Sequence, residues 1–211
     1  MERRTRIITA AICIPLFLLF IYAGGWWLGG LLLFLGVVGC VEYARIVQTS
    51  SYRHHQAALL LGWGYIILGF AGLYGARVES GVLWLLLIIW STDTAAYEFG
   101  RRFGKIPLAP TISPKKTQEG ALAGLIAGML VGLVWGLAVI KAGVIPSLLI
   151  AAFISALGQA GDLLESKVKR LAGVKDSGRL FPGHGGVLDR FDSLLLTAPF
   201  MYLFLLLINR A

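Results

Sequence analysis

Residues 83–105, LWLLLIIWSTDTAAYEFGRRFGK, begin as an apolar run and end in a cluster of charged side chains. A helix needs about 20 mostly apolar residues to cross a bilayer, and several runs in this 211-residue chain approach that length. Polar groups at membrane depth are energetically costly and tend to mark function. The stretch therefore predicts a membrane-spanning helix with a functional group of polar residues at its end.

The composition extends this prediction to the whole chain. Hydrophobic residues make up 57% and charged residues only 14%, with a mean hydropathy of +0.79, whereas soluble domains carry about a quarter charged residues. We expect an all-α, polytopic integral membrane protein with about seven transmembrane helices and no separate soluble domain. The expected spans are 7–23, 26–47, 57–75, 82–99, 121–140, 144–164 and 191–208.

We expect the chain to divide into N-terminal transmembrane helices over 1–80 and a second transmembrane part over 81–211 with two polar loops. The first 25 residues also fit a signal peptide, but the apolar segments that follow at once favour an uncleaved first span. Cys13 and Cys40 both lie inside apolar runs, so neither a disulfide framework nor a cysteine zinc site is expected.

Basic residues are distributed unevenly between the loops. If the N-terminus lies in the cytoplasm, only Arg77, Lys141 and Arg210 of the 19 Lys and Arg residues fall on the other side, in agreement with the positive-inside rule. We therefore expect a multi-pass protein of the cell (inner or plasma) membrane, with the loops over 100–120 and 165–190 in the cytoplasm and Ala211 outside. Topology then accounts for most of the net charge of +8, and no nucleic-acid partner is expected.

Three polar groups fall on the predicted cytoplasmic side. In the first, Asp93, Tyr97 and Arg101 follow one another at four-residue steps, which places them on one face of a helix. The plainer alternative is that Asp93 only pairs with a nearby arginine.

The loop that follows contains Pro107, Pro110 and Pro114, which exclude a continuous helix. We expect Lys115 and Lys116 to lie on an ordered turn there. Thr117 stands where the N-cap of the next helix is expected. The loop is interpreted either as a topology signal or as an arm that binds phosphate.

The second group is a polar face on the helix expected over 144–164, as it leaves the membrane. Polar side chains recur there at steps of three and four residues, at Ser155, Gln159, Asp162, Ser166 and Lys169. Glu165 and Lys169 have the spacing of an ordinary i, i+4 ion pair. Asp162 has no such cation on its own helix, so we interpret it as a ligand or as a charge partner for something bound.

The third group is GHGGVLDRFDS, residues 183–193, which places Asp189 and Asp192 at the first turn of the last helix. Asp189 alone fits a simple cap favoured by the helix dipole, but two like charges facing one way repel each other unless a cation lies between them. Mg²⁺ prefers oxygen ligands and keeps substrate phosphates in its coordination shell. The glycines allow close approach to a ligand, and His184 either binds a phosphate oxygen or is incidental. The residues alone predict Mg²⁺-dependent phosphate chemistry at a cytoplasmic membrane interface.

These motifs together resemble the signature of the phosphatidate cytidylyltransferase (CDP-diglyceride synthetase) family. SKVKRLAGVKDSGRLFPGHGGVLDRFD, residues 166–192, is similar to the family's pattern of S-x-x-K-R, K-D-S, P-G-H-G-G and D-R-x-D. The upstream stretch DTAAYEFGRRFGK and the following ISPKKTQEG, which ends in K-T-x-E-G at Lys116 to Gly120, resemble a second family motif. The resemblance covers roughly residues 90–195, whereas the first half is shorter than expected for most members and has fewer spans.

The resemblance implies the reaction CTP + phosphatidate → CDP-diacylglycerol + pyrophosphate in phospholipid biosynthesis. It implies metal-binding aspartates at Asp162 and Asp189, with Asp192 close by, and Mg²⁺ as the cofactor, with a second cation as an option. The catalytic residues expected from the motifs are Asp162, Lys169, Asp189, Arg190 and Asp192. Residues expected to bind substrate or phosphate are Asp93, Tyr97, Arg101, Ser113, Lys116, Thr117, Glu119, Arg170, Lys175, Asp176, Ser177, His184, Gly185 and Gly186. The expected partners are CTP, phosphatidate and membrane lipids, and a homodimer is an option.

Three alternatives stay open at this point. The same motifs suit a CTP-dependent enzyme that uses another lipid phosphate, such as an archaeal CDP-archaeol synthase. A cation transporter also buries carboxylates, but near the bilayer midplane and between broken helices, whereas here they lie at helix ends beside a basic loop. A lipid-binding scaffold without activity has no need of paired aspartates that face a glycine-rich turn.

Overall fold

The computed structural model describes residues 2–50 and 54–209, so the expected placement of Arg210 and Ala211 lies outside the described residues. Within these ranges seven helices are long and apolar enough to cross a membrane, which indicates a multi-pass membrane protein. They confirm the seven predicted spans, and several extend a few residues further at their polar ends. Their bounds are α1 Glu2–Ala23, α2 Gly25–Thr49, α3 His55–Gly75, α4 Gly81–Phe103, α5 Gln118–Trp135, α6 Val144–Leu171 and α7 Leu188–Ile208.

Two short helical turns complete the spans. The 3₁₀ turn η1, Val78–Ser80, precedes α4, and the π-helical turn η2, Gly136–Ile140, extends α5 to the end of its predicted span. The bend between α1 and α2 lies at Gly24 and Gly25, whose positive φ angles of 61° and 43° suit glycine.

The all-α prediction is incomplete, because residues after α4 form a small antiparallel hairpin of β1, Pro107–Ala109, and β2, Ser113–Thr117. The prolines exclude a helix here, as predicted. Lys115 and Lys116, however, lie on strand β2 rather than on a turn, because a residue before proline, as Ser113 is before Pro114, favours extended backbone. Successive side chains of a strand point to opposite faces, so the two lysines face opposite ways. Lys115 is exposed and Lys116 is half-buried.

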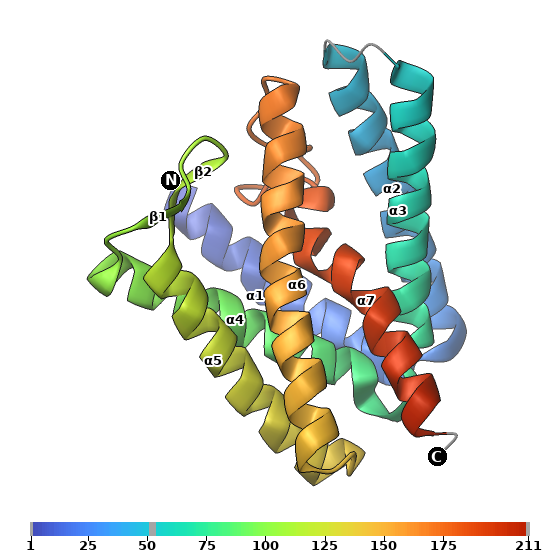
Figure 1. Ribbon diagram of the computed structural model, residues 1–211. Coiled ribbons are helices and arrows are strands. Elements are labelled where there is room, and N and C mark those ends of the chain that lie inside the picture. Colours follow the sequence, from blue (N-terminus) through green and yellow to red (C-terminus); the bar gives the residue numbers. More distant parts are fainter. Residues whose placement is uncertain (1, 51–53, 210–211) are drawn as a thin grey trace.

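The helices pack side by side around α7 and α4 (Figure 1). Helix α4 lies along α5, α5 packs against α6, and both α6 and α3 pack against α7, while α2 packs on α3. Helix α1 is the least buried of the seven and packs mainly against α2. The first half of the chain therefore packs against the second half mainly through the contact of α3 with α7.

Glycine at every fourth position of α5 brings its neighbours unusually close. Gly120, Gly124, Gly128 and Gly132 are all buried, and a Cβ on Gly124 would lie only 2.7 Å from the carbonyl oxygen of Thr92 on α4. Small residues at this spacing let membrane helices approach each other closely. The close contact of α4 and α5 fixes where the polar end of α4 meets the hairpin.

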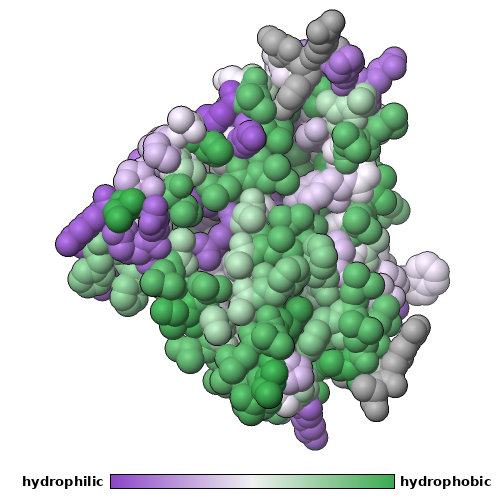
Figure 2. Space-filling model, viewed as in Figure 1, coloured by the Kyte–Doolittle hydropathy of each residue, from purple (hydrophilic) through white to green (hydrophobic). Residues whose placement is uncertain are grey.

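The polar connections gather at one end of the molecule. The hairpin, the connection over 172–187 and the start of α1 lie there, whereas the bend between α1 and α2 and the end of α7 lie at the other end (Figure 1). Figure 2 shows hydrophilic residues over the hairpin and mainly hydrophobic residues over the helices below it. The fold thus collects the three predicted polar groups at one end of a hydrophobic body.

Candidate functional site

A cavity of about 1170 Å³ opens among α1, α4, α6, α7 and the hairpin. Its lining combines apolar residues of α1, α2 and α4 with charged residues from the three predicted polar groups. The predicted site residues that line it are Asp93, Tyr97, Arg101, Lys116, Thr117, Asp162, Lys169, Arg170, Lys175, Asp176, His184, Asp189, Arg190 and Asp192. The structure therefore brings together most of the residues that the sequence motifs single out.

Three of the cavity's carboxylates come from three different helices. Asp93 lies on α4, Asp162 on α6 and Asp192 on α7, and they are close enough for their charges to interact. Lys116 and Arg190 are the cations whose charges reach Asp93. The alternative in which Asp93 only pairs with a nearby arginine is not seen, because no arginine forms an ion pair with Asp93 among the described residues, and Arg101 and Arg102 both pair with Glu98, at 3.1 Å.

Asp162 has a cation partner that its own helix does not supply. The Nζ of Lys116 on β2 forms an ion pair with Oδ2 of Asp162, and the Ser166 hydroxyl donates to Oδ1 at 3.4 Å. Both side chains of the ion pair are 30% exposed. The pair joins the predicted phosphate-binding lysine to the predicted metal ligand and connects the hairpin to α6.

Asp189 is more buried than Asp162 and accepts more hydrogen bonds. Its Oδ1 accepts from the Nζ of Lys169 at 2.6 Å, and its Oδ2 accepts from the amides of Ser177 and Gly186, both at 2.8 Å. Lys169 also forms the predicted pair with Glu165, at 2.5 Å. Asp189 is only 9% exposed. It is therefore more than a cap of α7, because it binds the connection that precedes the helix.

Asp192 faces the same cavity one helical turn further along α7. Its Oδ1 accepts from the amide of Ser193 at 2.6 Å, and its backbone carbonyl accepts from the Tyr65 hydroxyl of α3 at 3.4 Å.

Several predicted binding residues support the cavity without lining it. Ser177 and Gly186 bind Asp189, and Gly185 adopts a positive φ of 87° and accepts from the amide of Phe181 at 2.9 Å, which closes the turn over 181–185. Their role in binding substrate stays a prediction. In this structure their contacts fix the shape of the connection over 172–187.

Ser113 and Glu119 hold the hairpin. Ser113 pairs with Ala109 across the two strands. The Glu119 carboxylate, in the first turn of α5, accepts from the amides of Lys105 and Ile106 at 3.1–3.3 Å. The predicted N-cap is confirmed, because the Thr117 hydroxyl accepts from the amide of Gly120 at 3.2 Å.

Cations from several segments line the same cavity as the carboxylates. Arg170 at the end of α6 donates to the carbonyl of Ile112 in the hairpin at 3.4 Å. Arg101 lies 5.8 Å from the centre of the Tyr97 ring, within reach of a cation–π interaction. The cavity therefore combines several cations with several carboxylates.

The sequence motifs did not single out Glu42 of α2, which is 3% exposed. Its carboxylate accepts from the amides of Val187 and Leu188 at 3.0 and 3.1 Å, and it lies 3.0 Å from the Ser177 hydroxyl. The available signal was a lone carboxylate inside the apolar run over 26–47, since an ionisable residue within a membrane span is expected to have a function.

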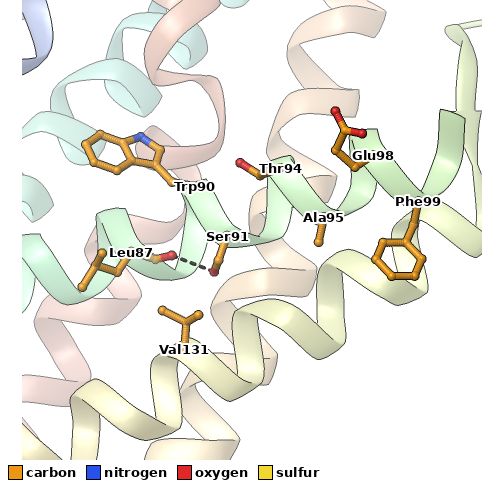
Figure 3. Close-up of a pocket in the computed structure, with 8 residues that line it drawn as sticks. All are labelled: Leu87, Trp90, Ser91, Thr94, Ala95, Glu98, Phe99 and Val131. Atoms are coloured by element: carbon orange, nitrogen blue, oxygen red, sulfur yellow. Dashed lines mark hydrogen bonds between the residues drawn. The ribbon is translucent and has the colours of Figure 1, made fainter. Parts of the chain in front are cut away.

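A second hollow of about 550 Å³ lies along α4 and is also lined by Val131 of α5 (Figure 3). Its lining is mostly apolar, and Glu98 is its only charged residue among those described. The Ser91 hydroxyl there donates to its own helix, at Leu87, over 2.7 Å (Figure 3). This hollow contains none of the predicted catalytic residues, so the larger cavity is the candidate active site.

The carboxylates of the cavity suit Mg²⁺ in a particular way. Among residues 2–50 and 54–209, no three His, Cys, Asp or Glu side chains lie close enough to hold a metal by themselves. Mg²⁺, however, is commonly held by one or two carboxylates together with waters and substrate phosphates. Asp162, Asp189 and Asp192 supply oxygen donors in a cavity that is large enough for phosphates, so they fit this kind of site.

Comparison with known proteins agrees with the motifs. The sequence profile of the cytidylyltransferase family matches residues 4–81 and 77–208. The chain is 46% identical to a protein of Staphylococcus saprophyticus, and 44% identical to proteins of Staphylococcus haemolyticus and Staphylococcus aureus, each named phosphatidate cytidylyltransferase. Each match spans 165 residues, which are 76% of this chain and 64% of the relative. Because the family profile covers nearly the whole described chain, this protein belongs to the cytidylyltransferase family.

Proposed function

We propose that the protein transfers the cytidylyl group of CTP to phosphatidate, which gives CDP-diacylglycerol and pyrophosphate. The observation that carries the proposal is the cavity at the polar end of the helix bundle, whose lining combines charged residues from three segments with apolar residues of the helices. The names of the curated relatives support the same activity.

The charged residues of the cavity suit the two phosphate-bearing groups that must meet. A lipid phosphate and a nucleotide triphosphate are both anionic, so cations have to offset their mutual repulsion. The cavity offers Lys116, Lys169, Arg170, Lys175 and Arg190 for this purpose. We assign Lys116 to a phosphate because it lies on the inner face of the hairpin, where it now neutralises Asp162.

The apolar part of the lining suits the lipid. It includes Phe17 of α1, Leu31 and Leu35 of α2, and Leu86 and Ile89 of α4. Apolar side chains replace water around the first part of an acyl chain, whose burial is favourable by roughly 25 cal/mol per Å². In this proposal the headgroup binds the charged residues of the cavity while the chains stay among apolar groups.

The reaction itself asks little covalent chemistry of the protein. A phosphate oxygen of phosphatidate forms a bond to the α-phosphorus of CTP, and the bond from that phosphorus to the β-bridging oxygen breaks. The electron pair of the broken bond leaves with pyrophosphate. Positioning and charge neutralisation dominate such transfers, and the cations of the cavity supply both.

We propose that Asp162, Asp189 and Asp192 hold Mg²⁺. When bound, the ion neutralises the charge that develops on the phosphate oxygens. In this proposal Lys116 and Lys169, which now pair with Asp162 and Asp189, bind phosphates when the substrates are present.

We also propose that the cavity faces the cytoplasm of a cell that carries the protein in its plasma membrane. Basic residues are concentrated at the cavity end, as the positive-inside rule requires. A fluorescent protein that matures only in the cytoplasm should stay dark when fused after Ala211 and should fluoresce when fused before Met1. The opposite pattern contradicts this orientation.

The activity is tested with the purified full chain, labelled CTP and a choice of lipid phosphates. We expect cytidine label in a chloroform-soluble product with phosphatidate and Mg²⁺, and none when Mg²⁺ is removed with EDTA. A product formed only with an ether-linked lipid phosphate would assign the enzyme to that substrate instead. Absence of labelled lipid with every lipid phosphate contradicts the proposal.

A further inference from the structure

We propose that Glu42 is a positioning residue for the transfer reaction, and that it fixes Asp189 through the Ser177 hydroxyl and the first turn of α7. The inference rests on the proposed function for its effect on catalysis. Its structural part, the coupling between Glu42 and Asp189, stands on the contacts alone.

Glu42 binds the start of α7 from a distant part of the chain. Its Oε1 accepts from the amide of Val187 at 3.0 Å, and its Oε2 accepts from the amide of Leu188 at 3.1 Å. The first amides of a helix have no partners within the helix, and a carboxylate is favoured there by the helix dipole. Glu42 therefore fixes the position of Val187 and Leu188, the two residues that directly precede Asp189.

The Ser177 hydroxyl connects the two carboxylates. Its oxygen lies 3.0 Å from Oε2 of Glu42 and 2.9 Å from Oδ2 of Asp189. A hydroxyl has a single proton to donate, so its orientation depends on both carboxylates at once. A change at Glu42 consequently alters a hydrogen bond that Asp189 receives.

The backbone leaves room for this arrangement only because two neighbours lack a side chain. A Cβ on Gly178 would lie 2.6 Å from Cδ of Glu42, and a Cβ on Gly186 would overlap the Glu42 carboxylate and the Ser177 hydroxyl. The amide of Gly186 donates to Asp189 at 2.8 Å. Gly186, two residues after His184, therefore allows the two carboxylates to approach the same connection.

Asp189 in turn reaches the cavity. It lines the cavity directly and pairs with Lys169, a second cavity residue, whereas Glu42 does not line the cavity. Glu42 therefore acts on the reaction only through other groups, and the name catalytic residue does not apply to it.

Glu42→Gln in the full chain tests the inference, since glutamine keeps the volume but turns one acceptor oxygen into a donor. We expect kcat for cytidylyl transfer to fall at least tenfold, while KM for CTP changes less than threefold. Thr197→Val is the matched control, because it removes a buried hydrogen bond within α7, from Thr197 to the Ser193 carbonyl at 2.7 Å, without contact to Glu42 or Ser177. We expect this control to keep kcat within threefold.

Residue-resolved hydrogen–deuterium exchange gives a readout that does not depend on activity. In Glu42→Gln we expect faster exchange at Val187 and Leu188, and also at Ser177 and Gly186, whose amides bind Asp189. Faster exchange at Val187 and Leu188 alone would overturn the coupling to Asp189. So would equal changes in Glu42→Gln and Thr197→Val.

A double variant tests the route through the hydroxyl. If Glu42 acts partly through Ser177, the combined loss of kcat in Glu42→Gln with Ser177→Ala is smaller than the product of the two single losses. A combined loss equal to the product of the two single losses overturns that route. If the wild-type chain transfers no cytidylyl group, the proposed function fails, and the exchange rates of Ser177 and Gly186 still decide whether Glu42 positions Asp189.

Discussion

The hairpin over 107–117 and the connection over 172–187 meet at the same cavity, but they are held in different ways. The hairpin presents Lys116 to Asp162 through an ion pair whose two side chains are each 30% exposed. The connection is bound by Glu42 and Asp189, both buried, through backbone amides and the Ser177 hydroxyl.

This difference predicts different consequences for charges that otherwise look alike in the sequence. A solvent-exposed ion pair contributes roughly 0–1 kcal/mol to stability, whereas breaking a buried pair by removing one partner costs roughly 3–5 kcal/mol. The partly exposed pair of Lys116 and Asp162 lies between these limits, so the hairpin charges are available to substrates at a lower cost to the fold than the charges around the connection. The charges around the connection belong to the fold as well as to the site.

The largest expected effects are those of Asp189→Asn and Asp162→Asn, which separate these two roles. Both variants should lose activity on the order of 10²-fold or more, because charge neutralisation around the phosphates supplies several kcal/mol. Only Asp189→Asn should also unfold at a clearly lower temperature, because it leaves Lys169 buried beside Glu165 alone. Activity assays and thermal unfolding in the same detergent measure the two effects.

Two results would contradict the proposed difference between the hairpin and the connection. Near-normal turnover of either variant at saturating Mg²⁺ removes its aspartate from the proposed metal site. Equal loss of stability in both variants shows that the ion pair of Lys116 and Asp162 also holds the fold.

Lys116 and Lys115 sharpen the comparison within the hairpin. A charge-assisted hydrogen bond to phosphate is worth roughly 1.5–3 kcal/mol, so Lys116→Ala should lower kcat/KM by about 10- to 150-fold. Lys115 also lines the cavity but is exposed and has no ion-pair partner among the described residues, so Lys115→Ala should stay within about threefold. Values of kcat/KM for CTP and for the lipid, measured separately, decide between them.

Equal small losses in the two lysine variants would leave the hairpin as a topology signal only. A larger loss in Lys115→Ala than in Lys116→Ala would show that the strand presents the other lysine to the phosphates.

The smallest effect is expected at the junction of the hairpin and α5. Loss of an N-cap costs about 1 kcal/mol, so Thr117→Ala should lower the free energy of unfolding by about that amount. Thr117→Ser keeps a hydroxyl and should stay close to wild type. Unfolding by SDS titration measures both variants, and an unchanged Thr117→Ala would mean that the cap contributes nothing to stability.

Local patterns in the sequence predicted the parts of the molecule that depend on neighbouring residues. The apolar runs predicted the seven helices, the position of Thr117 just before the fifth run predicted the cap, and the four-residue step predicted the pair of Glu165 and Lys169. Each of these depends on the geometry of a single helix or turn.

The missed features depend on contacts between segments far apart in the chain. The pair of Lys116 and Asp162 spans 46 residues, and the contact of Glu42 with Val187 spans 145. The prolines excluded a helix after α4, but they did not indicate that the loop would form a two-stranded hairpin. No periodic pattern encodes such contacts, because they follow from how the helices pack.

Glu42 belongs to the first part of the chain but contacts a connection in the second part. The division into residues 1–80 and a catalytic part over 81–211 stays a proposal, and the first part is expected to do more than fill the membrane. Helix α1 and helix α2 line the cavity, and α2 contributes Glu42 to the connection. A homodimer stays a prediction.

The central proposal is that the cavity transfers a cytidylyl group to a lipid phosphate. The most direct test follows the α-phosphate and the γ-phosphate of CTP separately. The purified full chain is incubated with phosphatidate, Mg²⁺ and CTP that carries ³²P at either the α or the γ position. We predict that α-label enters the chloroform-soluble lipid, while γ-label stays in water as pyrophosphate. Label in the lipid from γ-labelled CTP, or none from α-labelled CTP, would contradict the account.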